Sequence, residues 1–277
     1  MDPKDRSEEL ATHARDLQMN GFCLLENVIP AEMCADLRDR LMAISQRKRE
    51  ETPAATKISF VPGVINYDQS FALWLADDRI LALATDLFGP HVRISFTSSI
   101  TNEPGKQRTN WHADWPFNQN NAGHVPAPYP DRVMHLTAIT MVSPFTVVNG
   151  GTLVVPGSHR FSSNPSDAGL GIDPNCPYPT EHRVTGDPGT TLLFDSRVWH
   201  CSPANPSNAP RVALVARYAP WWLNLAILDP DSNLRRQMVT EPGLNNNIVP
   251  RIPRTVYATL PEKVQPLYRH WVKGNDP

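Results

Sequence analysis

Long apolar runs are absent from the sequence. No apolar run approaches the ~20 residues that a helix needs to cross a bilayer. The first sixteen residues, Met1 to Asp16, are charged throughout and lack the apolar core of a signal peptide. We therefore expect a cytoplasmic protein with no membrane partner.

An excess of one charge and paired cysteines are also missing. Lys and Arg number 26 and Asp and Glu number 28, so the formal net charge is 26 − 28 = −2. A chain this close to neutral has no electrostatic reason to bind nucleic acid. The four cysteines are scattered and form no CxxC pair, which argues against a disulfide framework. We expect reduced cysteines and a small molecule as the partner.

Proline, in contrast, is abundant at 28 residues, about twice the usual share. Its concentration in the second half indicates short strands and ordered loops. In the first ninety residues, helical spacing predicts helices at 8–19, 30–49 and 77–88, with a short strand at 21–25 between the first two. From residue 91 onward, short runs bounded by Gly, Pro and Asn predict strands at 92–96, 134–142, 151–155, 190–194 and 211–218.

Many short strands without regular intervening helices argue against a parallel α/β sheet and favour a sandwich or barrel of the jelly-roll type. We predict one domain, 1–277, that is mainly β with flanking α-helices. Residues 1–90 would form a helical support, 91–220 the jelly-roll core, and 221–277 a C-terminal extension with a helix at 261–272. The extension could serve as a lid and as the contact surface of a homodimer, and the sequence establishes neither role.

The segment Asn110–Trp115 carries the residues on which the functional prediction depends. On a strand, side chains two residues apart point to the same face, so His112 and Asp114 aim an imidazole and a carboxylate at one point. His200 follows an apolar run and is placed to supply a third ligand from another strand. Two histidines and one carboxylate on one side of a metal are typical of non-heme Fe(II) oxygenases, which keep the opposite positions open for a cosubstrate and O2.

Arg211 adds a separate signal, because a His-x-Asp pair alone is more often structural. This arginine begins an apolar strand, where a guanidinium needs a buried anion that its planar fork binds in bidentate fashion. The anion is either the carboxylate of a cosubstrate or a protein carboxylate such as Asp195. Taken alone, the sequence favours neither.

These elements together resemble the phytanoyl-CoA dioxygenase family of 2-oxoglutarate oxygenases. The order and spacing of the matching pieces agree over residues 90–220. The pieces are His112-Ala113-Asp114, the segment Asn149-Gly150-Gly151-Thr152-Leu153-Val154-Val155-Pro156-Gly157-Ser158-His159-Arg160, the segment His200-Cys201-Ser202-Pro203-Ala204-Asn205, and Arg211. The joint motif is specific for the family and its cofactors but not for a substrate, because family members act on very different molecules.

The resemblance implies a double-stranded β-helix (jelly roll, cupin-like) and a role for each motif residue. His112, Asp114 and His200 would bind Fe(II). Arg211 would bind the distal carboxylate of 2-oxoglutarate, and Ser202 would assist it. A further polar residue usually helps to hold the cosubstrate, and the candidates are Ser99, Thr101 and Thr140.

The implied reaction consumes O2 and 2-oxoglutarate, releases succinate and CO2, and most often hydroxylates a C–H bond of a small organic molecule. Related halogenases carry a small residue in place of the aspartate, so the presence of Asp114 argues against halogenation. Desaturation, epoxidation and ring closure stay open because they use the same oxidant. A pocket lined by Trp and Phe would suit a natural-product scaffold or an acyl chain.

Several residues around the motif are candidates for contact with the substrate, although core packing is the commoner fate of a tryptophan. The candidates are Trp115 and Phe117 after the ligand pair, Trp222 after the Arg211 strand, and His135 at the start of another strand. The loop at 118–131, rich in Asn, Gly and Pro, is either a lid over the site or an ordered loop without a gating role.

Two other classes of function are the alternatives. A jelly-roll binding protein without turnover would keep the fold but would not need the whole triad together with Arg211. A Zn²⁺ or Mn²⁺ enzyme could use the same three ligands for hydrolysis or isomerisation. Such an enzyme has no use for a buried anion anchor, so the presence of Arg211 favours the oxygenase.

Overall fold

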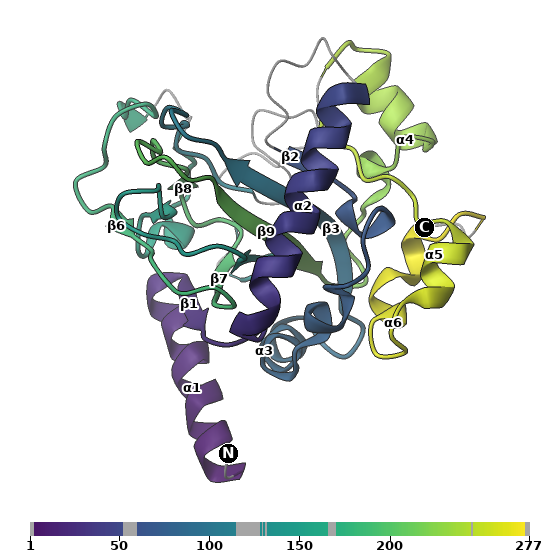
Figure 1. Ribbon diagram of the computed structural model, residues 1–277, viewed down its shortest axis with the longest axis horizontal. Helices are drawn as coiled ribbons and strands as arrows, with labels where there is room; N and C mark the ends of the chain where they lie inside the picture. Colours follow the sequence, from purple (N-terminus) through teal and green to yellow (C-terminus); the bar gives the residue numbers. More distant parts are fainter. Residues whose placement is uncertain are drawn as a thin grey trace.

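Two antiparallel sheets form the centre of the protein (Figure 1). The computed structural model describes residues 3–51, 60–114, 128, 130, 132–165, 170–244 and 246–274, with side chains from residue 7 onward. The larger sheet has the strand order β1 (Phe22–Leu25), β7 (Thr191–Asp195), β4 (Leu136–Met141), β9 (Arg211–Ala219), β3 (Arg93–Asn102) and β2 (Phe60–Pro62). The smaller sheet has the order β6 (His182–Arg183), β5 (Leu153–Val154) and β8 (His200–Cys201).

All pairings between these named strands are antiparallel. Strands that are far apart in the chain, such as β3 and β9, lie side by side, as expected when a β-chain folds back on itself in a jelly roll. The predicted fold class, mainly β with flanking helices, is therefore confirmed.

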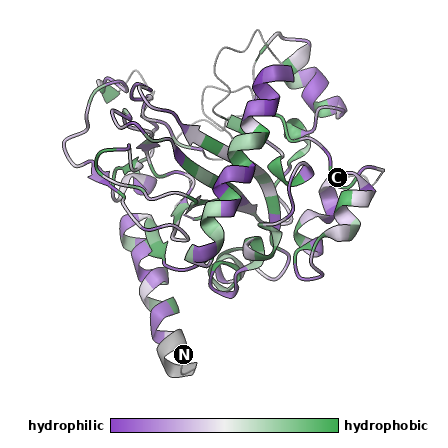
Figure 2. Cartoon of the chain, in the orientation of Figure 1, coloured by the Kyte–Doolittle hydropathy of each residue, from purple (hydrophilic) through white to green (hydrophobic). Residues whose placement is uncertain are grey.

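The longer helices lie outside the larger sheet. They are α1 (Pro3–Asn20), α2 (Ala31–Glu51) and α3 (Asp78–Phe88). In α2, Leu37, Leu41 and Ile44 recur at helical spacing and are buried against the sheet. Figure 2 shows the hydrophilic residues that alternate with them along this helix. Burial of this one apolar face, rather than the helix propensity of the sequence, accounts for most of the stability of such a helix.

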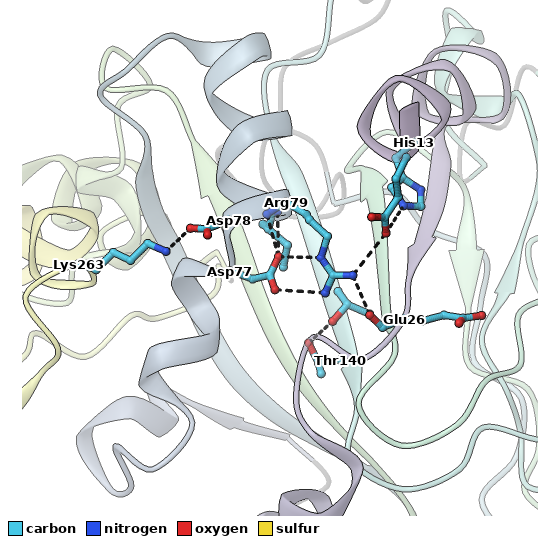
Figure 3. Close-up of polar contacts among 10 residues, drawn as sticks. His13, Glu26, Asp77, Asp78, Arg79, Thr140 and Lys263 are labelled. Atoms are coloured by element: carbon cyan, nitrogen blue, oxygen red, sulfur yellow. Dashed lines mark hydrogen bonds and ion pairs between the residues drawn. The ribbon is translucent and has the colours of Figure 1, made fainter. Parts of the chain in front are cut away.

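A charged cluster joins α1 and α3 to the start of the sheet (Figure 3). Asp77 caps α3 by accepting hydrogen bonds from the backbone N–H groups of Arg79 and Ile80. The Arg79 guanidinium in turn contacts Asp77 at 3.2 Å, Glu9 of α1 at 3.5 Å, and the backbone carbonyl of Glu26 at 2.9 Å. One half-buried arginine thus fixes three segments that are far apart in the sequence.

The strand register divides the larger sheet into two faces. On β9, Val212, Leu214 and Ala216 belong to the core under the helices. The alternate residues Ala213 and Val215 belong to a second core between the two sheets. Because side chains alternate along a strand, Arg211 and Arg217 share this inner face with Ala213 and Val215. The inner face is therefore the one that faces the smaller sheet.

The C-terminal segment differs from the single helix predicted at 261–272. It forms the short helices α5 (Arg254–Thr259) and α6 (Gln265–Tyr268), followed by a 3-10 turn at Arg269–Trp271. Pro266 sets the start of α6 near Gln265, because proline is tolerated only in the first turn of a helix.

This segment packs on the outer face of β3, where the Tyr268 hydroxyl bonds Thr97 at 3.2 Å and the Trp271 indole bonds the Ile94 carbonyl at 2.8 Å. Tyr268 and Trp271 thus belong to the core, while a lid or dimer role for 221–277 stays a prediction. In the part of the chain that the structure describes, no helix is long and apolar enough to cross a membrane.

Replacing Leu41 by alanine is expected to lower the free energy of unfolding by about 2–5 kcal/mol, because Leu41 is fully buried and its removal leaves a cavity. Met33 of the same helix is 45% exposed, so Met33→Ala is the matched control and should change stability by less than about 0.5 kcal/mol. Urea unfolding of both variants measures the difference. Equal effects of the two substitutions would contradict the packing of α2 described here.

Candidate metal centre

Backbone pairing brings the two candidate histidines together. The N–H of His112 donates to the carbonyl of His200 at 3.1 Å, and the N–H of His200 donates to the carbonyl of His112 at 2.9 Å. Their rings lie 4.2 Å apart between centroids. The segment 110–114 is not the regular strand that the sequence predicts, because His112 makes this single bridge outside any named strand.

Asp114 reaches the same point from two residues further along. Its N–H donates to the carbonyl of Ser196 at 2.7 Å, and its Oδ2 lies 3.6 Å from Nε2 of His200. One ligand atom from each of His112, Asp114 and His200 lies within 4.8 Å of the other two. The three residues therefore converge as a metal site requires.

The histidine tautomers also suit a metal. Nδ1 of His112 lies 3.0 Å from the carbonyl of Asn110, and Nδ1 of His200 lies 2.9 Å from the carbonyl of Val198. A carbonyl only accepts, so each Nδ1 carries the proton and donates it. Each Nε2 is then unprotonated and keeps its lone pair for a metal, which is the usual arrangement around ligating histidines.

The charge states match the needs of a divalent cation. Burial raises the pKa of the Asp114 carboxyl group, but the guanidinium of Arg217 and the nearby histidines lower it by more, to about 2. Burial and the neighbouring His112 lower the pKa of His200 to about 4. At neutral pH the site thus presents a carboxylate and a neutral imidazole, the forms that bind metal.

Arg217 is a residue of the site that the sequence reasoning missed. Its Nη2 lies 2.8 Å from Oδ2 of Asp114, and its guanidinium lies over the ring of Phe96 at 5.0 Å. The signal was present in the sequence, because Arg211 and Arg217 stand an even number of residues apart on one strand and must share a face. It was missed because a polar residue near the end of an apolar strand usually points to solvent.

Arg211 lies at the other end of the inner face of β9. It is 2% exposed, and its Nη2 lies 3.3 Å from the hydroxyl of Ser202. Its Nε is buried and has no hydrogen-bond partner, and burial lowers the pKa of the guanidinium to about 10. Asp195, the protein carboxylate considered above, instead pairs with Arg197 at 2.7 Å. No acidic side chain in the described ranges forms an ion pair with Arg211.

Three predicted cosubstrate residues lie on the wrong face of the sheet. Ser99 and Thr140 both pair with Leu214, and Thr101 pairs with Val212. Their side chains therefore share the helix-covered face, opposite to Arg211. Thr140, drawn in Figure 3, bonds the hydroxyl of Thr191 at 2.8 Å instead.

The neighbours Ser98 and Asn102 occupy the inner face in their place. Asn102 pairs directly with Arg211, and Ser98 pairs with Val215. Both are fully buried, and Oγ of Ser98 and Oδ1 of Asn102 have no hydrogen-bond partner. Side chains alternate between the two faces of a sheet, so a shift of one position along β3 moves a side chain from one face to the other.

His135 lies on the inner face but is fully engaged. Its Nε2 lies 2.7 Å from the hydroxyl of Ser95, and its Nδ1 lies 2.8 Å from the hydroxyl of Ser196. The Ser196 hydroxyl also contacts Thr137 at 2.8 Å, and Thr137 donates to Asp114 at 3.5 Å. Burial, together with Arg217, lowers the pKa of His135 to about 3. The neutral ring thus supports Asp114 from behind and leaves no nitrogen for a substrate.

The remaining substrate candidates have different outcomes. Trp222 is 48% exposed, and its contact with a substrate stays a prediction. Trp115 and Phe117 lie outside the described residues. Of the loop at 118–131, the structure describes only residues 128 and 130.

Comparison with known proteins agrees with this geometry. The family model of phytanoyl-CoA dioxygenase (PhyH) matches residues 17–213, which include the triad and Arg211. The chain belongs to the phytanoyl-CoA dioxygenase family. Members of this family are iron- and 2-oxoglutarate-dependent dioxygenases, and this protein is one of them.

Individual relatives are more distant. The chain is 29% identical over 236 residues to an ectoine dioxygenase of Nocardia farcinica, an alignment that covers 74% of each. Its fold is similar to that of EctD from S. alaskensis with bound Fe, with a TM-score of 0.60, 24% identity and 76% of each chain covered. It is also similar to HygX from Streptomyces hygroscopicus with nickel and 2-oxoglutarate bound, with a TM-score of 0.60, 17% identity, and 77% of this chain and 88% of HygX covered. The jelly-roll fold predicted from the sequence is thereby confirmed.

Replacing Arg217 by glutamine is expected to destabilise the metal-free protein by about 3 kcal/mol, because it leaves the buried Asp114 carboxylate without its cation. Urea unfolding at neutral pH measures this change. In an Asp114→Asn background the same substitution should cost less than half as much, since no charge is left unpaired. An equal cost in both backgrounds would show that Arg217 stabilises the fold by packing alone.

Proposed function

We propose that this dioxygenase hydroxylates a C–H bond of a small organic molecule, converting 2-oxoglutarate and O2 to succinate and CO2. In this proposal His112, Asp114 and His200 hold the iron, and Arg211 with Ser202 holds the distal carboxylate of 2-oxoglutarate. The observation that carries it is the buried guanidinium of Arg211. The Nε of Arg211 lacks a hydrogen-bond partner. Arg211 also lies on the same inner face as Arg217, which contacts Asp114.

The donor set fits iron, and Arg211 fits the cosubstrate. Two imidazole nitrogens and one carboxylate are the facial ligand set of non-heme iron oxygenases. A buried arginine with an unused face binds a carboxylate in bidentate fashion. When bound, iron and 2-oxoglutarate supply the oxidation of a C–H bond by O2, in which one oxygen atom enters the substrate and the other enters succinate.

The side chains of this protein position the reactants and exclude water. Asp114 stays charged because Arg217 contacts its carboxylate, and the histidines stay oriented because their Nδ1 atoms bond backbone carbonyls. Between the candidate metal ligands and Arg211, the inner face of the sheet carries the apolar residues Ile139, Val215 and Phe194, all of which are buried. Apolar side chains at these positions exclude water, which strengthens the electrostatic contacts inside the site and limits side reactions. A substrate with apolar surface, either a natural-product scaffold or an acyl chain, suits these surroundings.

Anaerobic addition of Fe(II) and then 2-oxoglutarate is expected to produce the weak visible charge-transfer band of the chelated complex. His112→Ala and Asp114→Ala should abolish the band, because each removes one ligand. His182→Ala is the matched control, since His182 is an exposed histidine of the same small sheet. If a folded, metal-loaded protein shows no band, the zinc or manganese alternative gains support.

Replacing Arg211 by methionine is expected to raise the Kd of 2-oxoglutarate about 100-fold, since two charge-assisted hydrogen bonds are lost. Metal binding should not change, which separates this effect from misfolding.

Ser98→Ala and Ser99→Ala form a matched pair on opposite faces of β3. Only the first should weaken 2-oxoglutarate binding, and a stronger effect of Ser99→Ala would contradict the register. Binding of both ligands without any O2 consumption across a panel of substrates would favour the binding-protein alternative.

A further inference from the structure

A cavity of about 750 Å³ lies between α1, α3 and the loops beside them. Its apolar lining includes Ala14 and Leu17 of α1, Leu83 and Leu87 of α3, and Val133. No candidate metal ligand and neither Arg211 nor Ser202 lines it. The cavity is therefore separate from the site described above.

Arginine is the main polar component of this cavity. Arg15, Arg132, Arg160 and Arg197 all line it, whereas Asp86 is the sole acid among the described residues that do so. With Asp195 counted as the partner of Arg197, the local charge is 4 − 2 = +2. Burial lowers the pKa of His159, which also lines the cavity, so this ring adds no charge at neutral pH. The described residues of the lining thus carry a net positive charge, whereas the chain as a whole is slightly negative.

Backbone carbonyls hold two of these arginines at the rim. Nη2 of Arg160 donates to the carbonyl of Gln18 near the end of α1, and Nη2 of Arg132 donates to the carbonyl of Leu87 near the end of α3. Each guanidinium has five N–H donors, so most of them remain available. Within the described ranges, neither arginine forms an ion pair with an acidic side chain. Each is thus held by a carbonyl, and neither has an acidic partner among the described residues.

We propose that this cavity binds an anion with a short apolar body, with a carboxylate or phosphate head at the arginines and the body against α1 and α3. An anion supplies the missing charge, and the planar guanidinium groups match its oxygen geometry. The concave shape concentrates the positive potential, which attracts anions more than the same charges on a flat surface. The apolar lining contributes the part of the affinity that a free inorganic ion would not gain.

Isothermal titration with octyl phosphate tests this site, on protein saturated with Mn²⁺ and 2-oxoglutarate so that Arg211 is occupied. One molecule of octyl phosphate should bind per chain. Inorganic phosphate, which lacks the body, should bind at least about tenfold more weakly, and octanol, which lacks the charge, should give no saturable heat. Octanoate in the same assay distinguishes a carboxylate ligand from a phosphate ligand.

The arginines are tested with the double variant Arg132→Gln/Arg160→Gln, which should weaken octyl phosphate binding by about tenfold or more. Arg236→Gln is the matched control because Arg236 is an exposed arginine paired with Glu241 outside the cavity. Arg15→Gln keeps the hydrogen bonds of Arg132 and Arg160 to backbone carbonyls, so it tests the cavity even if the double variant misfolds. It too should weaken binding. Absence of saturable binding, or equal affinity in all three variants, would overturn the proposal.

Discussion

The backbone pair between His112 and His200 is the constraint on which the rest of the site depends. Two mutual hydrogen bonds set the two imidazole rings 4.2 Å apart, in surroundings where His200 is almost completely buried. Two charged imidazoles would repel each other at this distance, so the arrangement favours neutral rings. Neutral rings with fixed Nδ1–H groups are what a metal needs. The remaining polar residues serve to bring a carboxylate to the same point and to keep it ionised.

The inner face of β9 carries two arginines, Arg217 and Arg211, in different electrostatic surroundings. Arg217 meets a carboxylate of the protein, Asp114, and the buried ion pair is complete without any ligand. Arg211 has no such partner among the described residues and is buried with an unused Nε. Burying an unpaired cation is costly, and a chain that keeps one gains nothing in stability from it. In the function that we propose, the distal carboxylate of 2-oxoglutarate would complete this pair and offset the cost.

Local signals in the sequence were sufficient to predict that His112, Asp114 and His200 converge, that Arg211 is buried, and where most strands lie. The cosubstrate candidates failed for a different reason. The face on which Ser99, Thr101 and Thr140 lie depends on pairing with β9, which is distant in the sequence, and on a bulge between Ile94 and Phe96 that shifts the register. The helix predicted at 261–272 is shorter than expected, because Pro266 can stand only in a first turn and so places the start of α6 near Gln265. Arg217 was missed because a polar residue near the end of an apolar strand usually points to solvent, and because its partner Asp114 lies on another segment.

The net charge of −2 illustrates what a sum over the sequence conceals. Near-neutrality argues against broad electrostatic partners such as nucleic acid, since these need a continuous charged surface. It says nothing about single anions, which respond to charge within about one Debye length. Folding leaves the buried Arg211 without an ion pair among the described residues and gathers four arginines around one cavity, while surface acids such as Asp36 and Glu51 pair with other basic residues. The anion recognition that we propose would thus be a product of the fold, because it depends on where folding places the arginines.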